Sequence, residues 1–378
     1  MVNRRWLFVV ALIFPSVASF ASDNEAINAT IVYGLNTNPH KLSSELTPVE
    51  QEYAAGEFKF RAKFFDTLYL AARADKSVYF DDARADEFNA SASIAVRSKF
   101  KVFKKRFRYK IGANYRAKDK TYVSKTTGLV ATFGGQSIAD RYDSTQNNYI
   151  AELSYKPYKS LNVEFAYEGR DKTYEEFQIA GLSNLDYSHQ RYRLGLEYKA
   201  SSVGKFFLNG AFKQREYVDK RAKDLEGDDI LDTDLIYDYF TTNIGYIYKP
   251  DKKTRWKYAY NYESRRDNSS GYYDGTSGYL SMSASYQLGD YHFIKGRFKY
   301  SKFSFENQLD EGDTPLDEDA KEKQGGTIMV GYEWVLATLF DNNLALYLEL
   351  EHSTFTNTNL IYSYEQNKAS AGIRWSVF

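Results

Sequence analysis

The sequence of 378 residues contains no cysteine, 6 Pro and 3 Met, and it has few continuous apolar runs. The absence of cysteine excludes disulfides, thiolate metal sites and cysteine catalysis. No apolar run is long enough for a membrane-spanning helix, and the Leu, Ile and Val runs of a large soluble core are scarce. Because 50 basic residues balance 50 acidic ones, the overall charge gives no indication of a nucleic-acid partner.

The N-terminus has the three regions of a bacterial signal peptide. Arg4 and Arg5 precede an apolar run from Trp6 to Phe14, and small residues follow as far as Ala21. This run is too short and too soon followed by polar residues to span a membrane. We therefore expect residues 1–21 to be a signal peptide and residues 22–378 to form a single exported domain.

Aromatic residues are abundant, with 34 Tyr and 26 Phe, and they alternate with charged residues. Between Arg106 and Lys118, apolar side chains occupy the odd positions, while most even positions carry Arg or Lys. A strand places alternate side chains on opposite faces, whereas a helix would scatter these charges around its axis. Similar alternation recurs at 161–167, 192–198, 256–263 and 344–351.

The connections between these segments also alternate, between short and long. Tight turns are expected near 65–66, 103–105, 156–159, 201–204, 249–253, 289–290 and 341–342, and most connections between them are longer and polar, such as 124–143, 221–234 and 307–323. Short periplasmic turns and longer outer loops are typical of outer-membrane barrels. We predict an all-β protein: a transmembrane, antiparallel, up-and-down barrel of about 16 strands, within a range of about 14 to 18, with both termini periplasmic.

Closure follows from the chemistry of the lipid phase. Hydrocarbon cannot satisfy backbone N–H and C=O groups, so a sheet that faces lipid must have no free edge. A soluble β-sandwich also has alternating strands, but its outward faces would not carry aromatic residues on nearly every strand. The barrel is therefore the preferred interpretation.

Two short segments resemble known outer-membrane barrels. The residues Gly372 to Phe378 resemble the closing strand of Gram-negative outer-membrane β-barrel proteins, whose C-terminal aromatic residue is read by the barrel-assembly machinery; Phe378 would be that signal. Trp375 and Ile373 are out of phase with that pattern, and a bulge near Ser376 would restore it. The segment Gly34 to Pro39 looks like the opening of uncharacterised barrels, some of which are similar to barrels of surface-lipoprotein and exopolysaccharide systems.

The face expected to line the lumen carries more basic than acidic residues. The alternation places these basic residues inside: Lys59, Arg61, Lys63, Arg73, Arg97, Lys99, Arg106, Arg108, Lys110, Arg116, Arg191, Arg193, Lys213, Arg215, Lys257, Arg265, Lys295, Arg297, Lys299 and Arg374. The acids assigned to the same face are Asp75, Glu152, Glu164, Glu168, Glu197, Glu263, Glu333, Glu349 and Glu351. A basic lumen favours anions. Alternatively, these charges pair into ladders that only hydrate and brace the barrel.

Other candidate sites are weaker. The acidic segments 224–234 and 310–319 lack the spacing of a calcium loop, so we expect solvated loops and no metal or cofactor. His352 and Ser353 are adjacent, so as strand residues they point to opposite faces and cannot form a catalytic dyad. Three aromatic residues, Tyr69, Phe207 and Tyr347, are expected to face the lumen, where they could contact sugars.

These observations leave three hypotheses open. The first is a porin-like channel for small hydrophilic, preferentially anionic solutes, with the segment 124–143 as the constricting loop. The second is an export channel for a surface polysaccharide. The third is a non-conducting barrel that acts as an adhesin or assembly scaffold. We expect no enzymatic activity, and the expected partners are outer-membrane lipid, lipopolysaccharide and the assembly machinery, with no nucleic acid. Oligomeric state is left open.

Overall fold

A computed structural model describes residues 26–43, 46, 48–103, 105–125, 127–309, 320–339, 342–359 and 362–377. In this part of the chain, sixteen antiparallel strands form a closed barrel, because β1 is hydrogen-bonded to β2 on one side and to β18 on the other. The prediction of a barrel with about this number of strands is confirmed. The signal peptide, Phe378, the acidic segment 310–319 and Asp341 of one expected turn lie outside the described residues.

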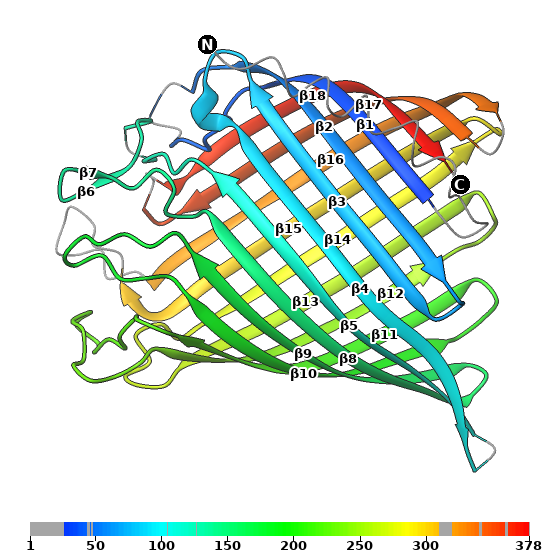
Figure 1. Cartoon of the computed structure of the whole chain (residues 1–378), viewed down its shortest axis with the longest axis horizontal. Coiled ribbons are helices and arrows are strands. Elements are labelled where there is room, and N and C mark those ends of the chain that lie inside the picture. Colours follow the sequence, from blue (N-terminus) through cyan, green and yellow to red (C-terminus); the bar gives the residue numbers. More distant parts are fainter. Residues whose placement is uncertain are drawn as a thin grey trace.

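The barrel strands follow one another around the wall in chain order (Figure 1). They are β1 (Ala26–Asn36), β2 (Gln51–Phe64), β3 (Leu68–Tyr79), β4 (Glu87–Val102), β5 (Lys105–Lys120), β8 (Ser144–Tyr158), β9 (Leu161–Tyr174), β10 (Tyr187–Lys199), β11 (Gly204–Tyr217), β12 (Ile236–Tyr248), β13 (Thr254–Asp267), β14 (Gly275–Leu288), β15 (His292–Leu309), β16 (Ala320–Leu339), β17 (Asn342–Asn357) and β18 (Tyr364–Val377). A short 3-10 helix, η2 (Ala83–Ala85), follows β3, and a small hairpin of β6 (Thr132–Phe133) and β7 (Gln136–Ser137) lies between β5 and β8.

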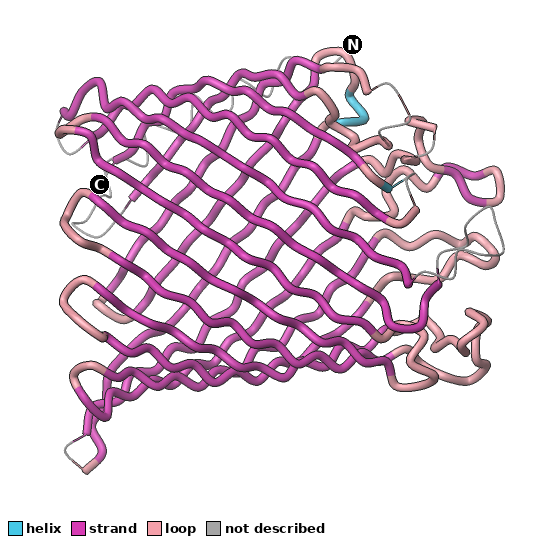
Figure 2. Tube along the Cα trace, turned by 180° about the vertical axis from the view of Figure 1, so that it is seen from behind, coloured by secondary structure: helices cyan, strands magenta, loops and turns pink. Residues whose placement is uncertain are grey.

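The two rims of the barrel differ. Tight turns, including 65–67 after β2 and 200–203 after β10, gather at one end, and the longer loops gather at the other (Figure 2). The segment between β5 and β8 is the longest described loop and contains the β6–β7 hairpin. No helix in the described ranges is long and apolar enough to cross a membrane.

The outer surface of the barrel is apolar. Side chains at alternate positions are exposed although they are hydrophobic, for example Ile31 at 70%, Leu194 at 52% and Leu350 at 62%. Such a surface would be unfavourable in water, but it suits a hydrocarbon environment. Aromatic residues contact one another across neighbouring strands on this surface: Phe107 stacks on Tyr155, and the tilted rings of Phe206 and Tyr246 have centroids 4.5 Å apart.

The closing strand β18 keeps its phase without a bulge. Its pairing with both β1 and β17 runs in continuous register from Lys368 to Val377. Ile373 is exposed on the outer surface, whereas Arg374 contacts Glu333 on the inner one. The bulge expected near Ser376 is therefore absent among the described residues, and Ile373 and Arg374 keep the alternation of the rest of the strand.

Candidate functional site: the charged inner wall

Ion pairs between strands that are not adjacent identify the inner face of the barrel. Arg193 of β10 reaches Glu152 of β8 at 3.4 Å, and Lys213 of β11 reaches Glu263 of β13 at 3.4 Å, each across one intervening strand. Side chains converge on the concave side of a curved sheet and diverge on the convex side. The residues that share this phase therefore line the lumen.

Arg193, on β10, is at the centre of a cluster of carboxylates on β8 and β9. Its guanidinium lies 2.8 Å from Glu164, 3.4 Å from Glu152 and 3.8 Å from Glu168. Lys110 binds Glu152 at 3.2 Å, and Arg191 binds Glu168 at 3.2 Å. The three acids and three bases form a connected ladder that braces this sector of the wall.

Two further sectors contain compensated charges. On β2 and β3, Arg73 contacts Glu57 at 2.8 Å and Asp75 at 3.1 Å. On β15, β16 and β18, both Lys295 and Arg374 bind Glu333, at 2.8 and 2.7 Å. The sequence assignment of inward acids omitted Glu57, although the alternation along β2 places it in phase with Lys59 and Arg61.

Other inward-facing cations form no ion pair with a described carboxylate. They are Arg61, Arg97, Lys99, Arg106, Arg108, Arg116, Arg215, Lys257, Arg265, Arg297 and Lys299, all of which were expected in the lumen. Several contact aromatic rings instead: Arg97 lies 4.5 Å from the Tyr69 ring centroid and Lys299 lies 5.0 Å from that of Tyr279. The inner wall therefore has compensated sectors and uncompensated ones.

Arg215 and Arg265 lie in a cluster of tyrosines near the loop rim. Arg215 is 4.5 Å from the Tyr187 ring centroid and donates a hydrogen bond to the hydroxyl of Tyr217 at 3.2 Å. Arg265 is 5.0 Å from the Tyr237 ring centroid. The Nε of Arg215 and one terminal nitrogen of Arg265 are buried without a hydrogen-bond partner in the described part of the chain.

This cluster corrects the expectation that Tyr69, Phe207 and Tyr347 are the few aromatic residues of the lumen. Tyr237 and Tyr239 are each 4% exposed, and they pack with Ala222 and Leu235 of the loop between β11 and β12. That loop therefore folds against the inner wall. The alternation along β12, where Tyr237 and Tyr239 are in phase with Thr241 and Asn243, could have revealed them.

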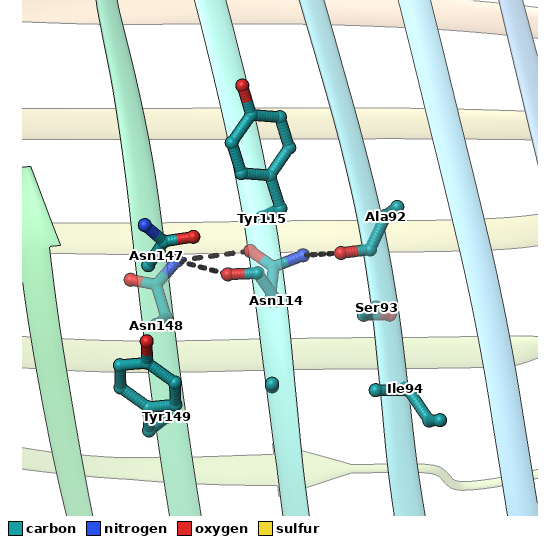
Figure 3. A pocket seen from close by; sticks show the side chains of 9 residues that line it. Ala92, Ser93, Ile94, Asn114, Tyr115, Asn147, Asn148 and Tyr149 are labelled. Atoms are coloured by element: carbon teal, nitrogen blue, oxygen red, sulfur yellow. Dashed lines mark hydrogen bonds between the residues drawn. The ribbon is translucent and has the colours of Figure 1, made fainter.

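A row of asparagines crosses β5 and β8 on the inner wall. The Asn114 side-chain amide donates to the Ala92 carbonyl oxygen at 3.1 Å, and that of Asn148 donates to the side-chain oxygen of Asn114 at 3.1 Å (Figure 3). Arg170 donates to Asn148 at 2.8 Å. These neutral groups separate two sets of inward cations on β5: Arg106 to Lys110 near the short-turn rim, and Arg116 near the loop rim.

The loop between β5 and β8, expected to constrict the pore, extends across part of the opening. The ammonium of Lys125 lies 5.8 Å from the ring centroids of both Tyr362 and Tyr364, the first residue of β18, although β1 to β4 separate β5 from β18 in the wall. Arg84, in η2, donates a hydrogen bond to the carbonyl oxygen of Gly128 in this loop at 3.0 Å. The loop is therefore attached to the neighbouring β3–β4 connection and, past four strands of the wall, to the start of β18.

Two other lysines, Lys41 and Lys323, lie close to the aromatic rings that Lys125 contacts. Lys41 lies 5.6 Å from the Tyr364 ring centroid, and Lys323 lies 5.3 Å from that of Phe355, whose ring stacks on Tyr364 at 5.1 Å. Burial and then the positive charges of neighbouring lysines lower the pKa of both Lys41 and Lys125. The opening at the loop rim therefore has a locally positive potential.

The remaining candidate residues form no recognisable chemical site. His352 contacts Asn367 at 2.8 Å while Ser353 contacts Thr327 at 3.0 Å, so the two lie on opposite faces. Within the described ranges, no group of three or more His, Asp or Glu residues could hold a metal ion. In the described acidic loop, Asp229 pairs with Lys223 at 3.4 Å.

Comparisons with known proteins return matches only among solved structures. No family model and no curated protein matches the chain. Similar structures include a loop-deletion mutant of OmpT, an outer membrane protein of Vibrio cholerae, with 13% identity, a TM-score of 0.41 and coverage of 94% of this chain and 100% of that one. A BenF-like porin from Pseudomonas fluorescens Pf-5 has 10% identity, a TM-score of 0.45 and coverage of 95% and 100%. OpdK of Pseudomonas aeruginosa, solved with vanillate, has 11% identity, a TM-score of 0.43 and coverage of 94% and 99%.

The location of the chain follows from its own architecture. A closed antiparallel sheet with an apolar, aromatic exterior, a charged interior, short turns at one rim and long loops at the other is the form in which β-proteins cross an outer membrane. The chain is an outer-membrane β-barrel.

Proposed function

We propose that this barrel is a porin-like channel that passes small hydrophilic solutes and prefers anions. The observation that carries the proposal is the set of inward-facing cations without a carboxylate partner among the described residues. It includes Arg297 and Lys299 on β15, and Arg97, Arg108 and Arg116 on β4 and β5. By contrast, most inward acids, such as Glu152 and Glu333, are bound by a base.

Unequal compensation gives the aqueous path a positive potential. A paired acid and base largely cancel each other's field beyond a Debye length of about 8 Å at physiological ionic strength. Uncompensated cations do not cancel, and the low-dielectric wall focuses their field along the lumen. Small anions are therefore concentrated in the pore and cations are depleted from it.

The test is the reversal potential of single channels in a planar bilayer that separates two concentrations of potassium chloride. Arg297→Gln together with Lys299→Gln removes two uncompensated inward charges and should move the reversal potential toward cation selectivity. Lys302→Gln, which removes one charge, is the outward-facing control on the same strand, because Lys302 faces outward and pairs with Glu322 at 2.7 Å. It should leave selectivity unchanged.

Two results would count against the proposal. A correctly inserted barrel that never conducts would favour the adhesin or scaffold, or an exporter that opens only with its partners. A conducting channel that prefers cations would show that the uncompensated residues do not set the potential of the path.

A further inference from the structure

Strands β4 and β5 project beyond their neighbours at the short-turn rim (Figures 1 and 2). Pairing of β4 with β3 ends at Val96, and pairing of β5 with β8 begins at Phe107. Beyond the backbone N–H of Arg97, which donates to the carbonyl oxygen of Thr67 at 2.8 Å, the two strands pair only with each other, down to Val102 and Lys105. We refer to residues 97–103 and 105–110, which include the first four residues of β5 that pair with β8, as the β4–β5 ribbon; Lys104 at its tip lies outside the described residues.

The two faces of the β4–β5 ribbon differ sharply. Its outer face carries aromatic rings: Phe100 stacks on Phe107 with centroids 5.4 Å apart, and Phe107 stacks on Tyr155 of β8 at 4.9 Å. This stack joins the ribbon to the apolar exterior of the barrel. The opposite face, in phase with the lumen, carries almost only Arg and Lys.

On this cationic face, like charges lie directly opposite each other in three successive inward pairs. The register pairs Arg97 with Lys110, Lys99 with Arg108, and Lys101 with Arg106. Successive inward pairs along a strand are separated by about 6.7 Å, so six cations occupy about 13 Å of ribbon. Like charges in directly opposite positions destabilise a sheet.

Little in the described structure offsets this repulsion. Lys110 binds Glu152, but Lys99, Lys101, Arg106 and Arg108 form no ion pair with a described carboxylate. A sheet edge can be protected from aggregation by one or two lysines. Six cations on a single face exceed that need, and all of them share the alternation phase of the lumen-facing residues.

The cationic face also continues into the lumen along β5. Above Lys110, the inward positions of β5 are Gly112, Asn114 and Arg116, followed by Lys118 and Lys120, which bind Glu87 at 3.3 and 3.2 Å. Cations thus occur on this face near both rims, separated by the uncharged positions Gly112 and Asn114. An elongated ligand on the ribbon would be aligned with the aqueous path.

We propose that the β4–β5 ribbon is a docking site for an extended polyanion with repeated carboxylates, such as an acidic oligosaccharide, at the periplasmic opening of the barrel. This goes beyond the passage of small solutes, because binding at the ribbon does not require the lumen to be open. Anionic lipid is disfavoured as the ligand, because the cations lie on the axis side of the ribbon and the rings on the outer side.

The test measures binding of a fluorescein-labelled oligogalacturonate to the refolded full chain in neutral detergent micelles, by fluorescence anisotropy. In Lys99→Glu with Lys101→Glu, the like-charge pairs with Arg108 and Arg106 become opposite-charge pairs. Affinity should fall by about tenfold or more, because attraction is replaced by repulsion at two positions. Resistance to unfolding should stay the same or rise, since the cross-strand pairs are now favourable.

Two further variants keep the result interpretable. Lys252→Glu with Lys253→Glu makes the same change in net charge in the turn between β12 and β13 at the same rim, and it should leave affinity within about twofold of the parent. Lys99→Gln with Lys101→Gln should give an intermediate affinity. Equal losses in the ribbon and turn variants would attribute binding to the overall field of the barrel and overturn the proposal.

Two competitors identify the ligand class. Inorganic phosphate should displace the oligogalacturonate only at concentrations at which sodium chloride does so; displacement at much lower concentration would indicate a site for single anions and overturn the proposal. Vesicles containing phosphatidylglycerol should not compete through the ribbon. If the ribbon variants lose binding to these vesicles while oligogalacturonate never binds, the ribbon is a lipid anchor and the proposal fails.

Discussion

Removal of the Arg193 side chain should destabilise the barrel through one particular carboxylate. Arg193 contacts Glu164, Glu152 and Glu168. In Arg193→Ala, Glu152 keeps Lys110 and Glu168 keeps Arg191, each at 3.2 Å. Glu164 retains no ion pair with a described residue, so the cost of the substitution is mainly that of one uncompensated carboxylate.

The expected magnitude follows from this count of partners. Loss of a hydrogen bond to a charged group costs about 1.5 to 3 kcal/mol. The Glu164 side chain is 30% exposed in the lumen, where water solvates part of the charge, so we expect a loss of about 1 to 2 kcal/mol in the free energy of unfolding. Glu164→Gln should offset most of that loss in the double variant, giving a coupling energy of about 1 kcal/mol.

The assay is equilibrium unfolding by urea in lipid vesicles, followed by tryptophan fluorescence, for the parent, the two single variants and the double variant. Lys213→Ala is a useful comparison, because it leaves Glu263 without the base that binds it at 3.4 Å. The reasoning is refuted if Arg193→Ala has the same free energy of unfolding as the parent. It is also refuted if Glu164→Gln lowers the free energy of unfolding of Arg193→Ala further and restores none of the loss.

Three other predictions concern the loops and the closing strand. Burial alone would raise the pKa of Asp82 above its ordinary value of 3.8. Hydrogen bonds from Arg84 and His40 outweigh burial and lower the pKa to about 2. Because the pKa is depressed in the folded state, Asp82 should stabilise the β3–β4 loop fully above about pH 4, and this contribution should disappear as the pH falls through about 2. Hydrogen exchange of that loop should show this dependence in the parent and not in Asp82→Asn. Lys125→Ala removes two cation–π contacts, each contributing about 0.5 to 1 kcal/mol, and should increase fluctuations of the single-channel current; an unchanged current trace would mean that the loop is held by its other contacts. Gly372→Ala would place a methyl group against the Ile31 carbonyl oxygen and the Tyr347 ring, costing about 1 to 3 kcal/mol in urea unfolding, whereas Gly210→Ala, which has nothing within 4 Å, should be nearly neutral.

The barrel itself was predictable because lipid imposes a strict pattern on each strand. Every spanning segment must present apolar groups outward, so the alternation seen at 106–118 and 344–351 identifies strands without knowledge of their partners. The tight turns were predictable for the same reason, since the alternation stops there. The phase of β18 was harder, because its small residues Ala369, Ser370 and Ala371 carry little signal.

The pairing of inward charges was not predictable. Alternation places Arg193 and Arg297 on the same face, but only the curvature of the wall and the stagger of the strands decide that the first meets three glutamates and the second meets none among the described residues. The tyrosine cluster around Arg215 depends likewise on a loop that folds inward. The projecting ribbon depends on strand lengths in β3 and β8, which its own sequence does not contain.

The face on which a charged residue lies and the ion-pair partner that it meets determine two different properties, the ion selectivity of the lumen and the stability of the barrel. Arg193→Ala and Arg297→Gln each remove one positive charge from the aqueous path, and the field at a distance depends on that sum. The two substitutions should therefore shift ion selectivity in the same direction and by similar amounts. Only the first leaves a carboxylate without its base, so only the first should destabilise the fold. Selectivity is thus a property that the alternation of the sequence determines, while stability depends on contacts that exist only in the closed barrel.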